Sequence, residues 1–390
     1  MSISFEVDDE LQAIVDAVHG FAEGRLRPDL RELEQQGGLP DELAQEAHEL
    51  GLTTLVLPES LGGMDLLDTR AAALCAEELA WGDVGAAVAL PGPRDAGSLV
   101  LELGTPEQAQ RLLAPFADEA EGWRRSAALA LVEGPFGLAP DAIGTTATRT
   151  GDGWVLRGEK RYVQAFATAE LTLVLARDAE SRASDPWDRL AVFAIEGRAA
   201  GLLPGERSRT LGLRTASYGP LRLEDVRVPA ANRLGPDAPG ALRRALRRAI
   251  ARKKVLDAAH LVGCARGTSE YAFKYAQERR AFGVFLYEHQ GLAFLMADMA
   301  TKVDGMRTLV WEAAAAHDQG GDALPLALSA HRQAAELAVE VASDAVQVLG
   351  GHGYIADHPV EKWMRDARTL SLVDGLVFED EDAGALLLEA

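Results

Sequence analysis

The spacing of hydrophobic residues changes twice along the chain and divides it into three parts. In the first part, apolar positions recur at helical spacing over residues 11–22, after Asp8, which suits an N-cap. Pro40 can open a second helix, and residues 105–108 form a capping box with proline at the first helical position. These signals predict an N-terminal helical domain over residues 1–124.

The middle part consists of short β-rich runs separated by turns. Those runs cover residues 127–133, 144–150, 153–158, 171–177, 190–195 and 220–228. Gly151, Asp152 and Gly153 form a hairpin signal between two of them. Regular short strands favour a small sandwich or barrel, and the lack of strand–helix alternation disfavours a Rossmann domain. We expect this β domain at residues 125–235.

Helical periodicity returns near residue 240. The predicted helices cover about residues 241–282, 288–319, 325–349 and 358–372. Long helices joined by short connections predict an antiparallel four-helix bundle over residues 236–390. The whole chain is therefore predicted to be α+β, with an N-terminal helical domain, a middle β domain and a C-terminal helical bundle.

Composition narrows the functional classes. The 390 residues carry a formal net charge of −21, which repels phosphate backbones and argues against nucleic-acid binding. Cys75 and Cys264 make neither a disulfide framework nor a metal-ligand spacing, so a reducing cytoplasmic location is expected. No apolar run approaches the ~20 residues of a membrane helix, which predicts no membrane span.

Motifs in the predicted bundle resemble those of a known family. Residues 278–283 read ERRAFG and are followed by Gln290, and residues 345–354 read AVQVLGGHGY. With LRLEDVRVP at residues 221–229, these runs resemble the acyl-CoA dehydrogenase family, and the resemblance covers nearly the whole chain. It implies FAD, a tetrameric assembly, oxidation of an acyl-CoA thioester to the α,β-enoyl-CoA, and transfer of electrons to a carrier protein.

The resemblance implies that each flavin is shared between two subunits, with its ring in one subunit's cleft and its diphosphate on the neighbour's bundle. The residues implied to hold the cofactor are Arg279, Phe282, Gln290, Gln347, Gly350 and Gly351, with Tyr162 beside the ring. Arg279 offers a fork of donors for a pyrophosphate, and Gln347 shares one helical face with the two glycines. The alternative is that Gly350 and Gly351 only end the helix as a C-cap.

The ring-side motifs depart from the family pattern. Where the family reads roughly TEP-x-x-GSD, the chain has Val132 and Leu138 in place of two hydroxyl residues, and neither can hydrogen-bond. Where the family reads KxWIT, Tyr162 keeps an aromatic surface, while Gln164 replaces the threonine expected to reach the flavin. We therefore expect the cleft for this chain's own flavin ring to bind it poorly.

The position of the catalytic base is also altered. The family commonly uses the glutamate of a YEGT motif, and the register along the chain places Asp374 and Leu376 there. Aspartate can accept a proton, but its side chain is shorter, and a displacement of about 1 Å can cost about a hundredfold in rate. Some relatives carry the base on the first bundle helix, where this chain has Lys253. Asp374 can also be interpreted as an exposed loop acid beside an acidic cluster.

Three functions remain open from the sequence. We favour a partner subunit of a mixed acyl-CoA dehydrogenase assembly, which completes the FAD site of a catalytic subunit and has lost its own. The alternatives are an independently active homomeric enzyme with Asp374 as base, and a flavin-free scaffold or binding protein of the same fold. The arginine run at residues 243–254 is interpreted as a solvated helix face, with an acidic partner or CoA phosphates as the sharper alternative. His289 and His352 have no second ligand at metal spacing.

Overall fold

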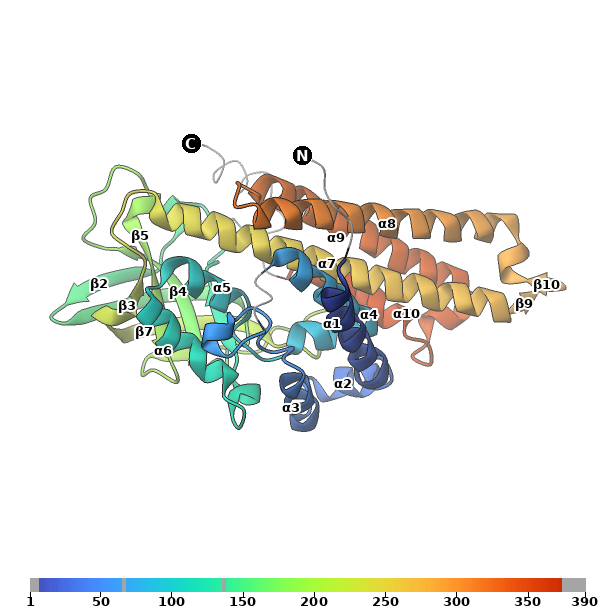
Figure 1. Cartoon of the computed structure of the whole chain (residues 1–390), viewed down its shortest axis with the longest axis horizontal. Coiled ribbons are helices and arrows are strands. Elements are labelled where there is room, and N and C mark those ends of the chain that lie inside the picture. The colour runs from blue at the N-terminus through green and yellow to red at the C-terminus, as the bar shows by residue number, and fades with distance from the viewer. Residues whose placement is uncertain (1–6, 65–67, 135–137, 374–390) are drawn as a thin grey trace.

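The computed structural model describes residues 7–64, 68–134 and 138–373. Helices form both ends of the chain, and a β-sheet lies at one end of an elongated helical body (Figure 1). This arrangement confirms the predicted order of a helical part, a β part and a helical bundle.

Within the described residues, the N-terminal part contains six α-helices. They are α1 (Asp9–Phe21), α2 (Leu30–Gln36), α3 (Asp41–Glu49), α4 (Thr69–Ala89), α5 (Arg94–Leu103) and α6 (Pro106–Leu113). Asp8 caps α1 by accepting a hydrogen bond from the Leu11 amide at 2.8 Å. Thr105 and Gln108 form the predicted capping box at the start of α6. In both places a side-chain oxygen satisfies an amide that the first turn leaves without a helical partner, which fixes where the helix begins.

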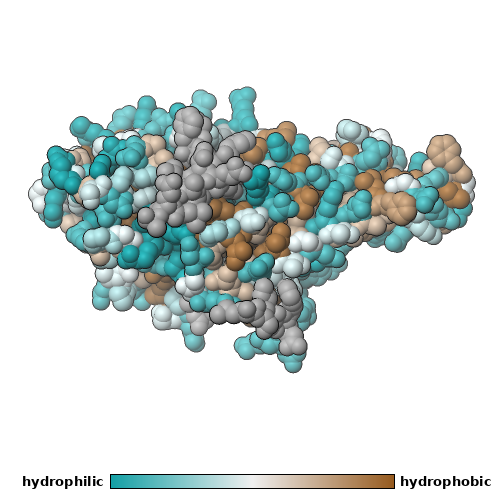
Figure 2. Space-filling view, turned by 90° about the horizontal axis from the view of Figure 1, so that it is seen from above, coloured by the Kyte–Doolittle hydropathy of each residue, from teal (hydrophilic) through white to brown (hydrophobic). Residues whose placement is uncertain are grey.

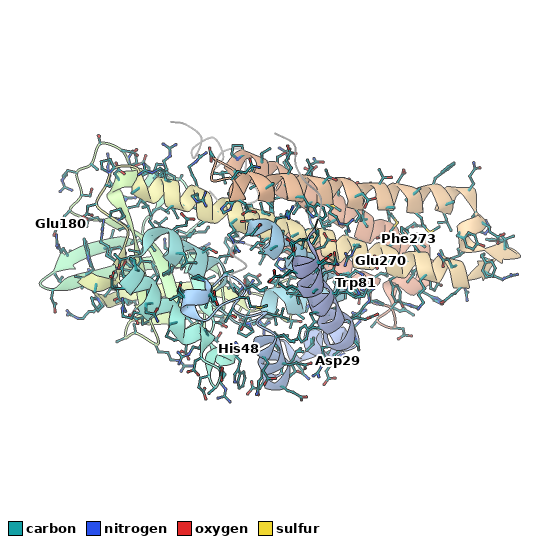
Figure 3. The ribbon with its side chains drawn as sticks, in the orientation of Figure 1. Asp29, His48, Trp81, Glu180, Glu270 and Phe273 are labelled. Carbon is teal, nitrogen blue, oxygen red and sulfur yellow. The ribbon has the colours of Figure 1, made fainter. Side chains whose placement is uncertain are left out.

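Helix α4 joins the N-terminal part to the bundle. Nearly all its residues are buried because it packs against α1 and against α7 (Ala241–Glu278). The Trp81 indole donates a hydrogen bond to Glu270 of α7 at 2.6 Å, and both residues are labelled in Figure 3. Extended backbone interrupts α4 at Asp83, whose buried carboxylate pairs with Lys362. α4 therefore belongs to the packed interior of the bundle as much as to the N-terminal part.

Eight strands form the sheet of the middle part. They are β1 (Ala127–Ala130), β2 (Thr146–Thr150), β3 (Gly153–Gln164), β4 (Leu171–Asp178), β5 (Leu190–Glu196), β6 (Leu202–Pro204), β7 (Tyr218–Pro229) and β8 (Arg233–Leu234). Their order is β6-β7-β3-β2-β4-β5-β8, and β1 pairs with β4. β1 and β2 run parallel to β4, and the other pairs in this sheet are antiparallel.

The long strand β3 extends beyond the predicted end at Gly158. Its pairing with β7 continues to Gln164, although the register shifts near Gly158 and again between Lys160 and Val163. Tyr162 takes a φ of 57° within the second shift. Such irregularities interrupt the two-residue alternation of side chains on which the sequence prediction relied.

The C-terminal part is a bundle of long helices. Its elements are α7, β9 (Arg280–Ala281), β10 (Val284–Phe285), α8 (Gln290–Asp318), α9 (Leu324–Leu349) and α10 (Val360–Leu370). The β9–β10 hairpin lies at the end of the molecule opposite the sheet (Figure 1). α7 ends at Glu278, before the predicted residue 282, because Arg280 already belongs to the hairpin.

The arginine-rich stretch of α7 is only partly solvated. Arg252 and Lys254 are buried, and Arg247 pairs with Asp322. The interpretation of this stretch as a solvated face is therefore wrong for these residues. The reason is that α7 packs against α4, α5, α8 and α9, which cover more than one of its faces.

Buried apolar side chains form two clusters. The larger one joins the N-terminal helices, one side of the sheet and the bundle, and the smaller one lies around Trp154, Phe193 and Leu221 in the sheet. The larger cluster crosses all three parts of the chain. Side chains that come from different parts can therefore form one site and be held in a fixed arrangement.

Features of other protein classes are missing from the described residues. Among residues 7–64, 68–134 and 138–373, no helix is both long and apolar enough to cross a membrane. The same residues contain no group of three or more His, Cys, Asp or Glu side chains that could hold a metal ion. Cys75 and Cys264 are buried, and burial raises the pKa of both thiols, so they act as packing residues.

Candidate functional site

A cleft opens where the three parts of the chain meet. Its walls come from the end of α4, the start of α5, β1, β3, β7, α7 and the end of α10. Tyr162 and Val132 line its sheet side, and Lys253 and Asp257 line its α7 side. Tyr162, predicted to lie beside a flavin ring, is 40% exposed there.

Gln164 also lines the cleft, but its amide is bound to the protein. Its Nε2 donates a hydrogen bond to the Val88 carbonyl at 2.5 Å, and Arg94 Nη1 donates to the same carbonyl. The side chain that replaces the family's threonine therefore uses one N–H group to bind the end of α4.

The two positions at which the family has hydroxyl groups are apolar and buried. Val132 lines the cleft at 4% exposure, and Leu138 is 1% exposed. Neither side chain can hydrogen-bond to the polar edge of a ring. A ligand group left without a partner in such a place loses about 1–3 kcal/mol of binding.

A buried ion pair lies next to Val132. Lys160 is fully buried, and its Nζ lies 2.5 Å from Glu133 Oε1 and 3.1 Å from the Leu131 carbonyl oxygen. Glu133 also accepts hydrogen bonds from the amides of Gly144 and Thr145. Burial lowers the pKa of Lys160 to about 8, although Glu133 opposes this. Burial opposes ionisation of Glu133, but the Lys160 charge and these hydrogen bonds hold its pKa below the usual value.

The α7 side of the cleft carries charged residues. Lys253 Nζ lies 2.5 Å from Asp257 Oδ2 and 3.8 Å from Asp95 Oδ2. The sequence placed Lys253 at the alternative base position, and this residue does line the cleft. Sequence reasoning missed Asp95 and Asp257 because no motif marks them and they come from helices far apart in the chain.

The predicted base lies outside the part of the chain that the structure describes. Val373, the last described residue, lines the cleft, and Asp374 follows it in the sequence. The role of Asp374 as a base therefore stays a prediction.

The other predicted site residues lie at the far end of the bundle. Arg279 and Phe282 belong to the segment that connects α7 and α8, and Gln290 is the first residue of α8. All three are exposed, Phe282 by 98%. Gln347 is exposed in the last turn of α9. None of these polar side chains points into a protein core, so each is accessible to a ligand or to another subunit.

Gly350 and Gly351 follow directly after α9. Gly350 has a φ of 58°, and a Cβ atom added to either glycine would meet no heavy atom within 4 Å. The Tyr275 hydroxyl lies 2.7 Å from His352 Nδ1, which holds this turn against the last turn of α7, just before Arg279. The glycines do end the helix, as the alternative interpretation states, and they also leave backbone accessible beside Arg279.

Apolar side chains are exposed at the same end of the bundle. They are Phe282, Val284, Tyr287, Phe294, Tyr354 and Ile355. Figure 2 shows hydrophobic residues along the bundle and at its far end. Large exposed apolar patches mark interaction sites on folded proteins, so this end has the character of an interface.

All three parts of the chain match domains of one protein family. The acyl-CoA dehydrogenase N-terminal domain matches residues 8–120, the middle domain matches residues 128–226, and the C-terminal domain matches residues 241–376. The predicted resemblance is therefore confirmed over all three parts.

Individual relatives and solved structures agree with this result. The chain is 31% identical to cyclohexane-1-carbonyl-CoA dehydrogenase of Geobacter metallireducens, over 95% of both chains. It is also 31% identical to a subunit of the caffeyl-CoA reductase–Etf complex of Acetobacterium woodii, over 91% of this chain and 92% of that one. The structure of butyryl-CoA dehydrogenase from Megasphaera elsdenii is similar with a TM-score of 0.87 and 28% identity, over 99% and 100% of the two chains. The chain belongs to the acyl-CoA dehydrogenase family, whose members are FAD-dependent oxidoreductases.

Proposed function

We propose that this chain is the partner subunit of a mixed acyl-CoA dehydrogenase assembly. In this role its bundle end completes the FAD site of a catalytic subunit, while its own ring cleft has lost the groups that hold and activate a flavin. The observation that carries the proposal is a contrast between two regions. In the cleft, Val132 has no polar group and Gln164 donates to the Val88 carbonyl, whereas Arg279 and Gln347 are exposed at the bundle end.

The residues of the bundle end fit the diphosphate half of FAD. Arg279 supplies a planar fork of donors, Gln290 and Gln347 supply amides, and the open backbone at Gly350 and Gly351 lets a ligand approach closely. The exposed apolar side chains around them give a second subunit a surface on which to pack. A shared site of this kind needs both the donors and the interface.

The residues of the cleft fit the ring less well. Tyr162 can cover a ring face, but Val132 and Leu138 provide no donor or acceptor. Lys160 is bound to Glu133, and Lys253 is bound to Asp257. Both of these cations are therefore already paired within the protein.

The assembly would oxidise an acyl-CoA thioester to the α,β-enoyl-CoA. FAD, when bound to the assembly, would supply the acceptor for the hydride of the β-carbon. We also propose an electron-carrier protein as the redox partner, since one relative is named as a subunit of an Etf complex. In this account the present chain contributes cofactor binding and subunit packing, and the catalytic subunit contributes the base.

A second candidate is an independently active homomeric enzyme that uses Asp374. One observation favours it: Val373, the residue before Asp374 in the sequence, lines the cleft. In that case purified chain alone would reduce its flavin with an acyl-CoA.

Co-expression tests the proposal. The chain is produced with each other acyl-CoA dehydrogenase chain of the same genome, with a tag on only one of the two. We expect one pairing to co-purify and to reduce its flavin on addition of acyl-CoA, while the present chain alone does not. Full turnover by the present chain alone would contradict the partner role and favour the homomeric enzyme.

A further inference from the structure

Two histidines and two tyrosines form a cluster at the bundle end. The Tyr275 hydroxyl lies 2.7 Å from Nδ1 of His352, and the Tyr271 hydroxyl lies 2.8 Å from Nδ1 of His358. The two imidazole rings are stacked, with centroids 5.4 Å apart and an angle of 15° between their planes. Because Tyr271 and Tyr275 are one turn apart on α7, that helix holds both histidines in the same way.

The contact with Tyr275 leaves the second ring nitrogen of His352 available. We assign the proton of the neutral ring to Nε2, because the Tyr275 O–H donates to Nδ1. Within residues 7–64, 68–134 and 138–373, His352 makes no other hydrogen bond, and its Nε2 atom is not buried. This Nε2–H group is therefore a donor that a ligand can reach.

His352 belongs to the turn that the proposed diphosphate site uses. It directly follows Gly350 and Gly351, where a Cβ atom added to either residue would meet no heavy atom within 4 Å. Tyr275 lies one turn before the exposed Arg279, so its contact with His352 ties the turn to the end of α7 that carries this arginine. Phosphate oxygens accept hydrogen bonds from N–H groups, and charged donors bind them more strongly. A protonated His352 would be a second charged donor on the surface that carries Arg279.

Charged groups from the neighbouring elements surround the histidine pair. They are Glu278 and Arg279 at the end of α7, Arg31 of α2, Glu361 of α10 and Asp357 in the loop before α10, while the last turn of α9 carries the neutral Gln347. Arg31 and Glu361 lie 2.5 Å apart and offset each other. Glu278 and Asp357 favour a positive imidazole, and Arg279 opposes it until an anion neutralises the arginine. Two positive charges in stacked rings also repel, so the pair accepts one proton before the second.

We infer that His352 is a further binding residue for the FAD diphosphate and that its protonation makes the FAD affinity depend on pH. This inference rests on the proposed function, in which the bundle end binds that diphosphate. The anion offsets the repulsion from Arg279 and from the stacked His358, so the complex with FAD holds a proton that the free site gives up. Linkage then requires the affinity to rise as the pH falls through the range in which histidine titrates, by at most about tenfold per pH unit for one proton.

The FAD dissociation constant of the mixed assembly tests this inference. Flavin fluorescence measures it between about pH 5.5 and about pH 8.5, and light scattering checks that the assembly stays intact. The wild-type assembly should bind FAD about five- to twentyfold more tightly at the lower pH. His352→Gln should remove this dependence and should match wild type within about twofold at the higher pH, because an amide also donates one hydrogen bond.

Lysine at the same position separates ligand binding from structural support. His352→Lys keeps a positive charge over the whole range, so it should bind FAD with a flat pH profile, about as tightly as wild type does at the lower pH. A histidine that only packed the turn against Tyr275 would not be replaced by lysine. Loss of affinity at every pH in both variants would overturn the inference, and if His352→Gln does not assemble, His352→Lys decides.

His289→Gln is the matched control. His289 lies at the same end of the bundle, but its Nε2 atom contacts the Ala281 carbonyl oxygen at 3.2 Å. This variant should keep the wild-type pH profile. A profile that His352→Gln leaves unchanged, or that His289→Gln flattens equally, would show that His352 is not the group that binds.

Arg279→Gln distinguishes a failure of this inference from a failure of the proposed function. If Arg279→Gln weakens FAD binding while His352→Gln leaves the pH profile unchanged, only the role of His352 is wrong. If neither substitution changes FAD binding, the bundle end does not hold the diphosphate and both proposals fail. If the chain retains FAD as a homo-oligomer instead, the same measurements apply to that assembly, because its bundle end would then serve a neighbouring copy.

Discussion

Polar side chains in and next to the cleft are bound to other protein groups, whereas those at the far end of the bundle are exposed. In the cleft walls, Gln164 is bound to the Val88 carbonyl and Lys253 to Asp257, and the buried Lys160 next to Val132 is bound to Glu133. At the bundle end, Arg279 and Gln347 are exposed, and the backbone at the glycines that follow α9 is open. Donors that the protein already satisfies give a ligand little binding energy, whereas exposed donors beside an apolar surface can serve a ligand and a second subunit.

On the proposed function, this difference reflects which half of a shared site the chain has kept. A chain that held its own flavin ring would need donors in its cleft, and a chain that served only as a scaffold would not need an exposed Arg279 beside the turn after α9.

Replacing Lys160 with methionine tests whether the Lys160–Glu133 ion pair stabilises the fold next to the cleft. We expect the free energy of unfolding to fall by about 3–5 kcal/mol, because Glu133 would keep its carboxylate in a largely buried place without its partner. Urea denaturation measures the change. Lys274→Met, on the exposed surface of α7, is the control and should change stability by less than about 0.5 kcal/mol. If Lys160→Met and the control behave alike, the ion pair does not hold the wall.

His260 should make the stability of the chain depend on pH. Because its pKa in the folded chain is lowered to about 4, the unfolded chain binds a proton between about pH 6.5 and pH 4 that the folded chain does not. Stability contributed by this group is therefore present at neutral pH and falls as the pH drops, by up to about 1.4 kcal/mol per pH unit. Unfolding midpoints of wild type and His260→Gln across this window measure the effect. Parallel curves would show that His260 is not held neutral by burial.

Substitutions of two neighbouring arginines test whether the bundle end binds FAD. Arg279→Gln should weaken FAD retention in the mixed assembly by about ten- to a hundredfold, because a charge-assisted contact to the diphosphate is lost. Arg280→Gln is a matched control, since Arg280 is also exposed but stacks over Phe285. Fluorescence of the flavin released from each complex gives the affinity. Equal affinities for the two variants would remove the main support for the shared site.

The smallest expected effect concerns Gln164. Gln164→Thr loses the hydrogen bond to Val88 and should reduce stability by about 0.5–1.5 kcal/mol. We expect no gain in flavin retention by the chain alone, because Val132 and Leu138 remain apolar. Absorbance of the purified variant measures the flavin. A clear gain would mean that the cleft is one substitution away from binding a ring, and the contrast between the two regions would no longer hold.

Local chemistry was enough to predict much of the fold. Asp8 and the Thr105–Gln108 box mark helix starts because the capping groups lie within a few residues of the amides they satisfy. The end of β3 was not predictable in this way, since its pairing with β7 continues through two register shifts. The burial of Arg252 and Lys254 also depends on packing partners from distant parts of the chain.

The residues of the candidate site were also only partly predictable from the sequence. Motif positions led to Tyr162, Lys253 and Arg279, and the structure places the first two in the cleft and the third at the exposed bundle end. Asp95 and Asp257 could not be found from the sequence, because no motif marks them and they lie on helices that are far apart in the chain.

The most direct test of the central claim counts flavins per chain in two preparations, the chain alone and the chain with its co-purifying partner. The account predicts little FAD in the pure homo-oligomer and, in the mixed assembly, half as many flavins as chains, all bound with their rings in the partner. One FAD per chain in the pure homo-oligomer, with the ring in this chain's own cleft, would contradict it.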